Sequence, residues 1–100
     1  TKVVEKGRSA EAKRSLGAMR KAQEAYLLEG GGARTDAMSD LFTEAPTGCV
    51  ATHYFRYSTT TTVGTAVRCT GSGKAPHSAA AYGVNLNYVS GIWSGSAGYF

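Results

Sequence analysis

The sequence has few of the residues from which catalytic and metal sites are built. Its 100 residues include two histidines, two cysteines and seven acidic residues, and they contain neither a GxGxxG nor a GxSxG motif. The histidines and cysteines could be combined as four zinc ligands, but their spacing matches no compact metal motif. We therefore expect no enzyme activity, no metal and no cofactor.

Two weaker patterns have ordinary explanations. Asp36, Asp40 and Glu44 recur at four-residue intervals and could help to hold calcium, but they lack the spacing of an EF-hand. We interpret them as carboxylates that face solvent. The run GSGK at 71–74 lacks the other residues of a phosphate-binding loop and is interpreted as a turn.

Residues 2–29 predict one continuous helix. They contain no proline and no β-branched residue after Val4, and three glycines follow, the first of which can end a helix. Such a helix is on the order of 40 Å long, whereas a compact domain of this size has a radius of gyration of about 13 Å. One end of the helix is therefore expected to protrude.

The apolar residues of this helix predict which end packs. One face carries a core stripe that only Gln23 interrupts: Ala12, Leu16, Met19, Tyr26 and Leu27. Toward the N-terminus the same face meets Arg8 and Glu5, so we expect the first half to have no core of its own. The opposite face carries a second, mostly small-residue stripe, on which a neighbouring helix could pack closely: Val3, Gly7, Ala10, Ala18, Ala25 and Leu28.

After a connector at about 30–47, the composition predicts a β-sheet over about 48–95, so the chain forms a single α+β domain. In the connector, a short helical turn starting at Asp36 or Ser39 would bring Leu41 and Phe42 onto the sheet. Residues 49–58 and 61–70 predict a hairpin whose paired residue numbers sum to about 118. A strand at 82–88, with Tyr82, Val84, Leu86 and Tyr88 inward, and a short strand at 92–94 complete an antiparallel sheet of four strands.

This register places Cys49 opposite Cys69. In an exported protein the pair suggests a disulfide, whereas in the cytosol the two residues could be buried thiols.

The net charge of +4 permits contact with an anionic polymer or surface. Most of this charge lies on the helix, and we interpret it as a solvated helix face with ion pairs at helical spacing. A DNA or anionic-surface binding module that uses Arg56, Arg68 and Lys74 is the alternative from a different functional class. A group of aromatic residues could form a platform on which single strands stack, but we interpret it as a packed sheet face and its rim: Tyr54, Tyr57, Tyr82, Tyr88, Trp93, Tyr99 and Phe100.

The helix, the connector and the cysteine-linked sheet together resemble the type IV pilin and pseudopilin family. The resemblance rests on residues 9–26, SAEAKRSLGAMRKAQEAY, which look like the second half of that family's long N-terminal helix. Beyond Gly32 it rests on the order of the elements alone.

The resemblance implies a structural subunit of a bacterial extracellular filament at the cell surface, which reaches it through the inner membrane and periplasm. Its partners would be copies of itself or other pilins, and inner-membrane assembly machinery. An apolar half-helix would precede this chain and anchor it in the membrane before assembly, which agrees with a sequence that starts at Thr1 and has no apolar run of about 18 residues.

Within the family, a short pilin is favoured and a pseudopilin of a type II secretion system is the alternative. The cysteines would close the first hairpin instead of tying a C-terminal loop to the sheet, as they do in many pilins. The C-terminal residues SGSAGYF also lack the carboxylates with which major pseudopilins bind calcium.

Overall fold

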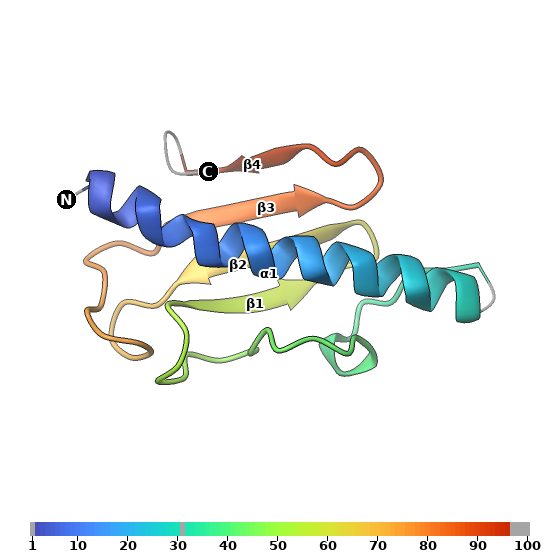
Figure 1. Ribbon diagram of the computed structural model, residues 1–100, viewed down its shortest axis with the longest axis horizontal. Coiled ribbons are helices and arrows are strands. Elements are labelled where there is room, and N and C mark those ends of the chain that lie inside the picture. The colour runs from blue at the N-terminus through green and yellow to red at the C-terminus, as the bar shows by residue number, and fades with distance from the viewer. Residues whose placement is uncertain (1, 31, 97–100) are drawn as a thin grey trace.

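The computed structural model describes residues 2–30 and 32–96, and within these ranges the side chains from Gly7 onward. In chain order the elements are α1 (Lys2–Glu29), the 3-10 helix η1 (Met38–Asp40), β1 (Phe55–Thr59), β2 (Val63–Arg68), β3 (Gly83–Asn87) and β4 (Trp93–Gly95). The strands pair antiparallel in the order β1-β2-β3-β4. The predicted α+β fold is confirmed: one long N-terminal helix packs on a four-stranded antiparallel sheet (Figure 1).

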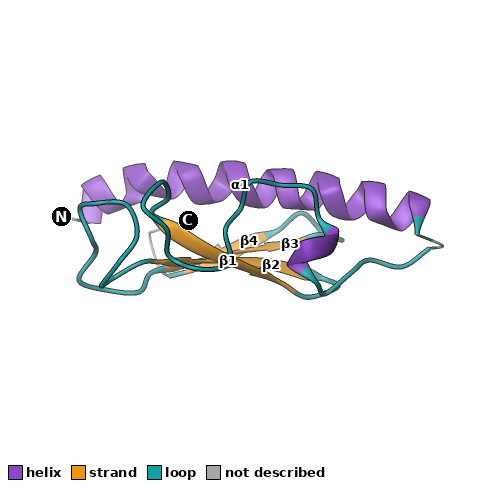
Figure 2. Cartoon of the chain, turned by 90° about the horizontal axis from the view of Figure 1, so that it is seen from below, coloured by secondary structure: helices purple, strands orange, loops and turns teal. Residues whose placement is uncertain are grey.

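Helix and sheet form two layers, with α1 lying along one face of the sheet (Figure 2). Its contacts are mainly with the central strands β2 and β3. A helix of 28 residues is about 42 Å long at 1.5 Å per residue, and the longest extent of the molecule is 44 Å. The helix therefore sets the length of the whole molecule.

The core lies between the predicted face of α1 and the facing side of the sheet. Ala12, Leu16 and Met19 are fully buried, whereas Tyr26 and Leu27 at the end of the helix are half-buried. Their partners are the inward residues of three strands: Phe55, Tyr57, Ala66, Val84 and Leu86, together with Tyr88 just after β3. Of the predicted inward residues, Val84, Leu86 and Tyr88 are buried and Tyr82 is half-buried.

The prediction that the first half of the helix lacks a core is wrong from Arg8 onward. The Arg8 guanidinium lies 5.5 Å from the centre of the Tyr54 ring, and Ser9 is buried. The end that projects past the sheet is the C-terminal end of α1, where Leu28 is 84% exposed (Figure 1). An apolar periodicity misses the packed N-terminal half because its contacts are made by polar side chains.

The predicted hairpin register is wrong by five residues. Phe55 pairs with Arg68 and Tyr57 with Ala66, so paired numbers sum to 123. An odd shift turns every side chain of one strand to the other face, so Ala66 and Arg68 lie on the helix side with Phe55 instead of opposite to it. The physical reason is the turn, which is closed at Thr60 by hydrogen bonds to Val63, within a run of threonines that carries no turn signal.

The disulfide prediction is confirmed, although not through the predicted pairing. Cys49 lies in a loop before β1, and Cys69 follows β2 directly. Their Cα atoms are 5.9 Å apart. The bond therefore ties residues 49–54, which were predicted as strand and form a loop, to the end of the central strand β2.

The connector is held mainly by the buried residue Gln23. Its amide nitrogen donates to the Thr35 carbonyl at 2.7 Å, and its amide oxygen accepts from the Thr35 backbone N–H at 3.0 Å. Leu41 is buried as predicted, but Phe42 is 98% exposed. The prediction for Phe42 is wrong because η1 ends at Asp40 and Leu41 is already extended, so consecutive side chains point in opposite directions.

Candidate functional site

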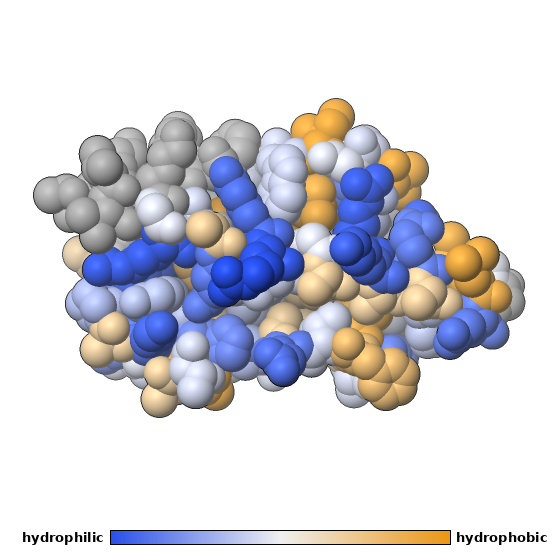
Figure 3. All heavy atoms as spheres, in the orientation of Figure 1, coloured by the Kyte–Doolittle hydropathy of each residue, from blue (hydrophilic) through white to orange (hydrophobic). Residues whose placement is uncertain are grey.

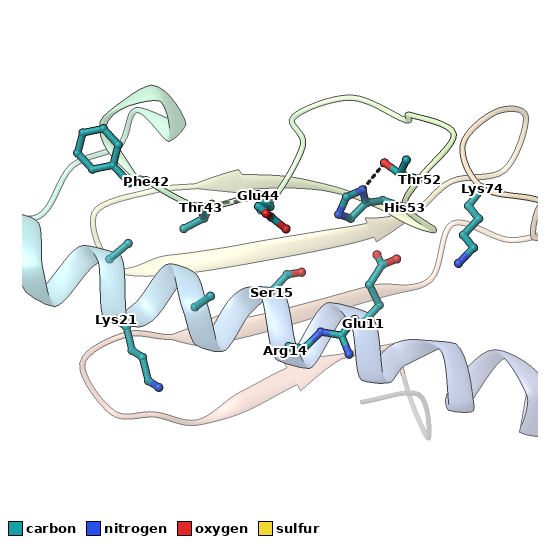
Figure 4. A pocket seen from close by; sticks show the side chains of 13 residues that line it. Glu11, Arg14, Ser15, Lys21, Phe42, Thr43, Glu44, Thr52, His53 and Lys74 are labelled. Carbon is teal, nitrogen blue, oxygen red and sulfur yellow. Dashed lines mark hydrogen bonds between the residues drawn. The ribbon is translucent and has the colours of Figure 1, made fainter.

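A groove of about 650 Å³ lies between α1 and the segment that leads from η1 toward β1. The helix lines it with Glu11, Arg14, Ser15, Ala18, Lys21 and Ala22, and the facing wall comes from residues 42–45, Thr52, His53 and Lys74. Figure 4 shows Glu11 and Ser15 pointing from the helix toward the facing wall, whereas Lys21 points away from it. A smaller hollow of about 190 Å³ adjoins the groove at Phe42 and Ala22.

The two ends of the groove differ in chemistry. One end is lined by the exposed Phe42 and by the small side chains Ala18 and Ala22. At the other end Arg14, His53 and Lys74 gather near Glu11 (Figure 4). The groove thus offers an apolar end and a mainly cationic end.

Glu11 in the floor of the groove serves a structural purpose. One carboxylate oxygen accepts the backbone N–H of Tyr54 at 2.9 Å, and the other accepts the Tyr57 hydroxyl at 2.8 Å. Burial raises the pKa of Tyr57 well above its ordinary value of 10.0; the Ser15 hydroxyl opposes this shift, and the hydrogen bond to Glu11 adds to it. Glu11 therefore joins the helix to the start of β1, and both of its oxygens are occupied.

Two cationic side chains of the groove are not neutralised by an acidic side chain of the described residues. Arg14 and Lys74 are exposed, and within residues 7–30 and 32–96 neither forms an ion pair. The Lys74 ammonium lies 4.9 Å from the centre of the Tyr54 ring, and its backbone N–H donates to the His53 carbonyl at 2.8 Å. The His53 Nδ1 lies 2.8 Å from the Thr52 hydroxyl oxygen.

The stripe opposite the core faces solvent. Gly7, Ala10, Ala18, Ala25 and Leu28 are all exposed, while the Val3 side chain lies outside the described residues. Other large apolar side chains are exposed too, notably Phe42, Val89 and Ile92. Figure 3 shows most of the strongly hydrophobic surface in the half of the molecule that carries the C-terminal end of α1.

The predicted group of anion-contacting residues is not a single surface. Arg56 and Lys74 are exposed, but Arg68 is only 1% exposed. Its guanidinium donates to the carbonyls of Tyr54, Cys69 and Pro76 at 2.8–3.1 Å. The prediction for Arg68 is wrong because the shifted register turns this side chain under the helix, where it holds two loops together.

The described part of the chain offers neither a metal-binding cluster nor a membrane-spanning helix. No group of three or more His, Cys, Asp and Glu side chains there could hold a metal ion. Of the three carboxylates at four-residue intervals, Asp40 accepts a hydrogen bond from the Thr35 hydroxyl, while Asp36 and Glu44 are exposed. No described helix combines the length and apolar character needed to cross a bilayer.

The predicted aromatic surface is mostly a packed one. Tyr57 and Tyr88 are buried, and Tyr54, Tyr82 and Trp93 are half-buried against the core. The last two aromatic residues, Tyr99 and Phe100, lie outside the described residues.

Comparisons of the chain with protein-family models, with curated proteins and with solved structures found no match. The resemblance to type IV pilins therefore stays a prediction from residues 9–26 and from the order of the elements.

Sequence reasoning missed the groove itself. The helix charges, which include Arg14 and Lys21, were interpreted as a solvated face, and Phe42 was predicted to lie on the sheet. The one available signal was Phe42, a large apolar residue placed next to the buried Leu41 in a segment without helical periodicity.

Proposed function

We propose that this chain is the globular domain of a structural subunit of a bacterial type IV pilus-like filament, located at the cell surface and without catalytic activity. In this proposal the subunit packs against copies of itself through the exposed face of α1. The observation that carries it is the division of α1 into two faces. One buries Ala12, Leu16 and Met19 against the sheet, and the other presents Ala10, Ala18 and Ala25 to solvent.

Three further features support the proposal. The helix runs the whole length of the molecule, so side-by-side helices could bring subunits together along their long axes. Small side chains on the outer face permit close approach of a neighbouring backbone. The disulfide between Cys49 and Cys69 suits a protein that works in an oxidising compartment.

The experiment uses the full coding sequence in its native host. Antibodies raised against residues 1–100 and detected with gold particles by electron microscopy should decorate filaments sheared from the cells. Label confined to cell bodies, with no labelled filament, would contradict the proposal.

A pair of matched variants tests the helix face. Ala10→Glu places a charge on the exposed stripe while keeping a strong helix former, so it should abolish or strongly reduce labelled filaments. Ala79→Glu makes the same change at an exposed position of the loop before β3, outside the stripe of α1, and should leave filament number unchanged. Equal filament numbers in the two variants would show that the face of α1 bearing Ala10 is not the assembly surface.

A further inference from the structure

The groove beside α1 combines features that a filament-packing helix does not need. Its helical wall runs from Glu11 to Ala22, which is about 17 Å along the axis. An extended peptide rises about 3.3 Å per residue, so about five residues would fill this length. The dimensions suit a short extended segment.

The chemistry of the two ends defines what such a segment carries. Phe42 with Ala18 and Ala22 offers a surface for an apolar side chain. Arg14 and Lys74 offer unpaired positive charge at the other end. Ser15 and Thr43, between these ends, can hydrogen-bond to a peptide backbone.

The mixture of charges argues against a continuous polyanion. Glu44 is exposed on the loop side, and the Glu11 carboxylate lies in the floor. A nucleic acid, which carries a phosphate at every nucleotide, would bring negative charge against both. A peptide can place its carboxylates against Arg14 and Lys74 and keep them away from Glu44. Glu11 lies at that end, but both of its oxygens already accept hydrogen bonds from Tyr54 and Tyr57.

We propose that this groove binds an extended peptide segment of another protein, with an acidic side chain against Arg14 and Lys74 and an apolar side chain against Phe42. Charge complementarity and the exposed ring together select this occupant. The peptide proposal can be tested separately from the filament proposal. Of the outer stripe, the groove lining includes Ala18 but neither Ala10 nor Ala25.

The direct test measures fluorescence polarisation with labelled pentapeptides, Phe-Ser-Ser-Glu-Glu and the reversed order, below about 0.1 M salt, where the Debye length exceeds about 10 Å. At least one order should bind more tightly than the same peptide with lysines in place of the glutamates. The proposal is overturned if the lysine peptides bind equally well or better.

Matched variants then locate the site. Arg14→Glu replaces an attraction with a repulsion and should weaken binding about tenfold. Lys13→Glu makes the same charge change at the neighbouring exposed position, which does not line the groove, and should change affinity less than about twofold. Equal losses in the two variants would mean nonspecific attraction and would overturn the site.

The apolar end has its own control. Phe42→Ser should weaken the phenylalanine-containing peptide several-fold and leave a serine-only acidic peptide unaffected, because only the first peptide reaches the ring. Equal losses for both peptides would contradict the placement.

Two other probes test the class of partner. A single-stranded oligothymidylate and an oligogalacturonate should each bind more weakly than the peptide. If either binds more tightly and responds to Arg14→Glu, the groove belongs to that class of ligand and the peptide proposal fails. Amide shifts in a nitrogen-15 NMR spectrum should fall on residues 11–22, 42–45, 52–53 and Lys74, and shifts confined to other residues would also refute it.

Discussion

Two irregular segments follow α1 in the chain, and they are attached to the rest of the fold in different ways. The first half of the connector, from Ala33 to Leu41, depends on hydrogen bonds to one buried helix side chain, Gln23, and on the burial of Leu41. The loop that forms the outer wall of the groove is attached in two ways: by the disulfide at Cys49, and by the hydrogen bonds of Glu11 to Tyr54 and Tyr57.

The two segments differ in the number and kind of attachments that hold them. The groove wall is fixed to the end of β2 as well as to the helix, so its position does not rely on one element. The connector is attached to the helix by the buried Gln23 and by the partly exposed Arg34–Glu24 ion pair at 2.8 Å, without a covalent bond. The energetic consequences of breaking the two kinds of attachment should differ in size and in place.

Removing the disulfide should have the largest effect. The two cysteines are 20 residues apart, and a cross-link of this loop size restricts the unfolded chain by about 3 kcal/mol. For a domain of this length the loss corresponds to a fall in Tm of roughly 10–20 °C. Thermal unfolding followed by circular dichroism, with and without reductant, measures it.

The control for this prediction is the double variant Cys49→Ser with Cys69→Ser. It should match the reduced protein and show no further response to reductant. A wild-type Tm that does not change on complete reduction would contradict the view that the covalent tie dominates.

Replacing Gln23 with leucine should cost about 2 kcal/mol, because the Thr35 backbone N–H and carbonyl lose their partner in a buried site. The damage should be local: amide hydrogen exchange should quicken at Thr35 and Ala37 and stay slow in β2. Urea unfolding gives the total effect.

Lys13→Leu, a change from polar to apolar at an exposed helix position, should alter stability by less than about 0.5 kcal/mol. If Gln23→Leu is no more destabilising than Lys13→Leu, the connector is held by something other than this glutamine.

Gly64→Ala should disturb the hydrogen bonds around Gln23, at a cost of about 1–2 kcal/mol. A Cβ atom at this position would lie 2.6 Å from the Tyr88 hydroxyl oxygen. That hydroxyl lies 2.6 Å from the Thr59 hydroxyl, which in turn accepts a hydrogen bond from Gln23. Urea unfolding of the purified variant measures the loss.

Two variants sharpen the interpretation of Gly64. Gly48→Ala adds a methyl group where nothing lies within 4 Å, so it should be close to neutral. Combining Gly64→Ala with Tyr88→Phe removes the clashing oxygen and should be less destabilising than the sum of the two single changes. Additive losses would show that the hydroxyl is not the obstacle.

The sequence predicts the helix and its core face because Ala12, Leu16 and Met19 recur at helical spacing and the glycines mark the end. It also predicts the inward face of β3, where Val84 and Leu86 alternate with asparagines. In both cases the determining pattern is local, so no knowledge of distant residues is needed.

The hairpin register and the groove could not be predicted, since both depend on contacts between distant residues. The threonines at 59–62 allow several turns, and the observed one is selected by the packing of Phe55 and Tyr57 under the helix. Glu11 accepts hydrogen bonds from Tyr54 and Tyr57, which follow it in the sequence by 43 and 46 positions. No periodicity in the helix could predict these contacts.

The smallest predicted effect concerns the hydrogen bond between Tyr57 and Glu11, the second attachment of the groove wall. Tyr57→Phe leaves one carboxylate oxygen of Glu11 without its donor and should cost about 1 kcal/mol near neutral pH. Urea unfolding measures this loss, which should be clearly smaller than that from reduction of the disulfide. A cost equal to that of disulfide removal would reverse the ranking of the two attachments.

The same phenol should make stability depend on alkaline pH. Its pKa in the folded protein lies above the unfolded value of 10.0, mainly because it is buried, so the folded state retains a proton that the unfolded state loses. Stability from this group is complete below pH 10 and declines as the pH rises further. Burial raises the pKa of Tyr88 as well, so Tyr57→Phe should make the decline shallower without abolishing it, whereas an unchanged slope in urea unfolding across this range would contradict the assignment.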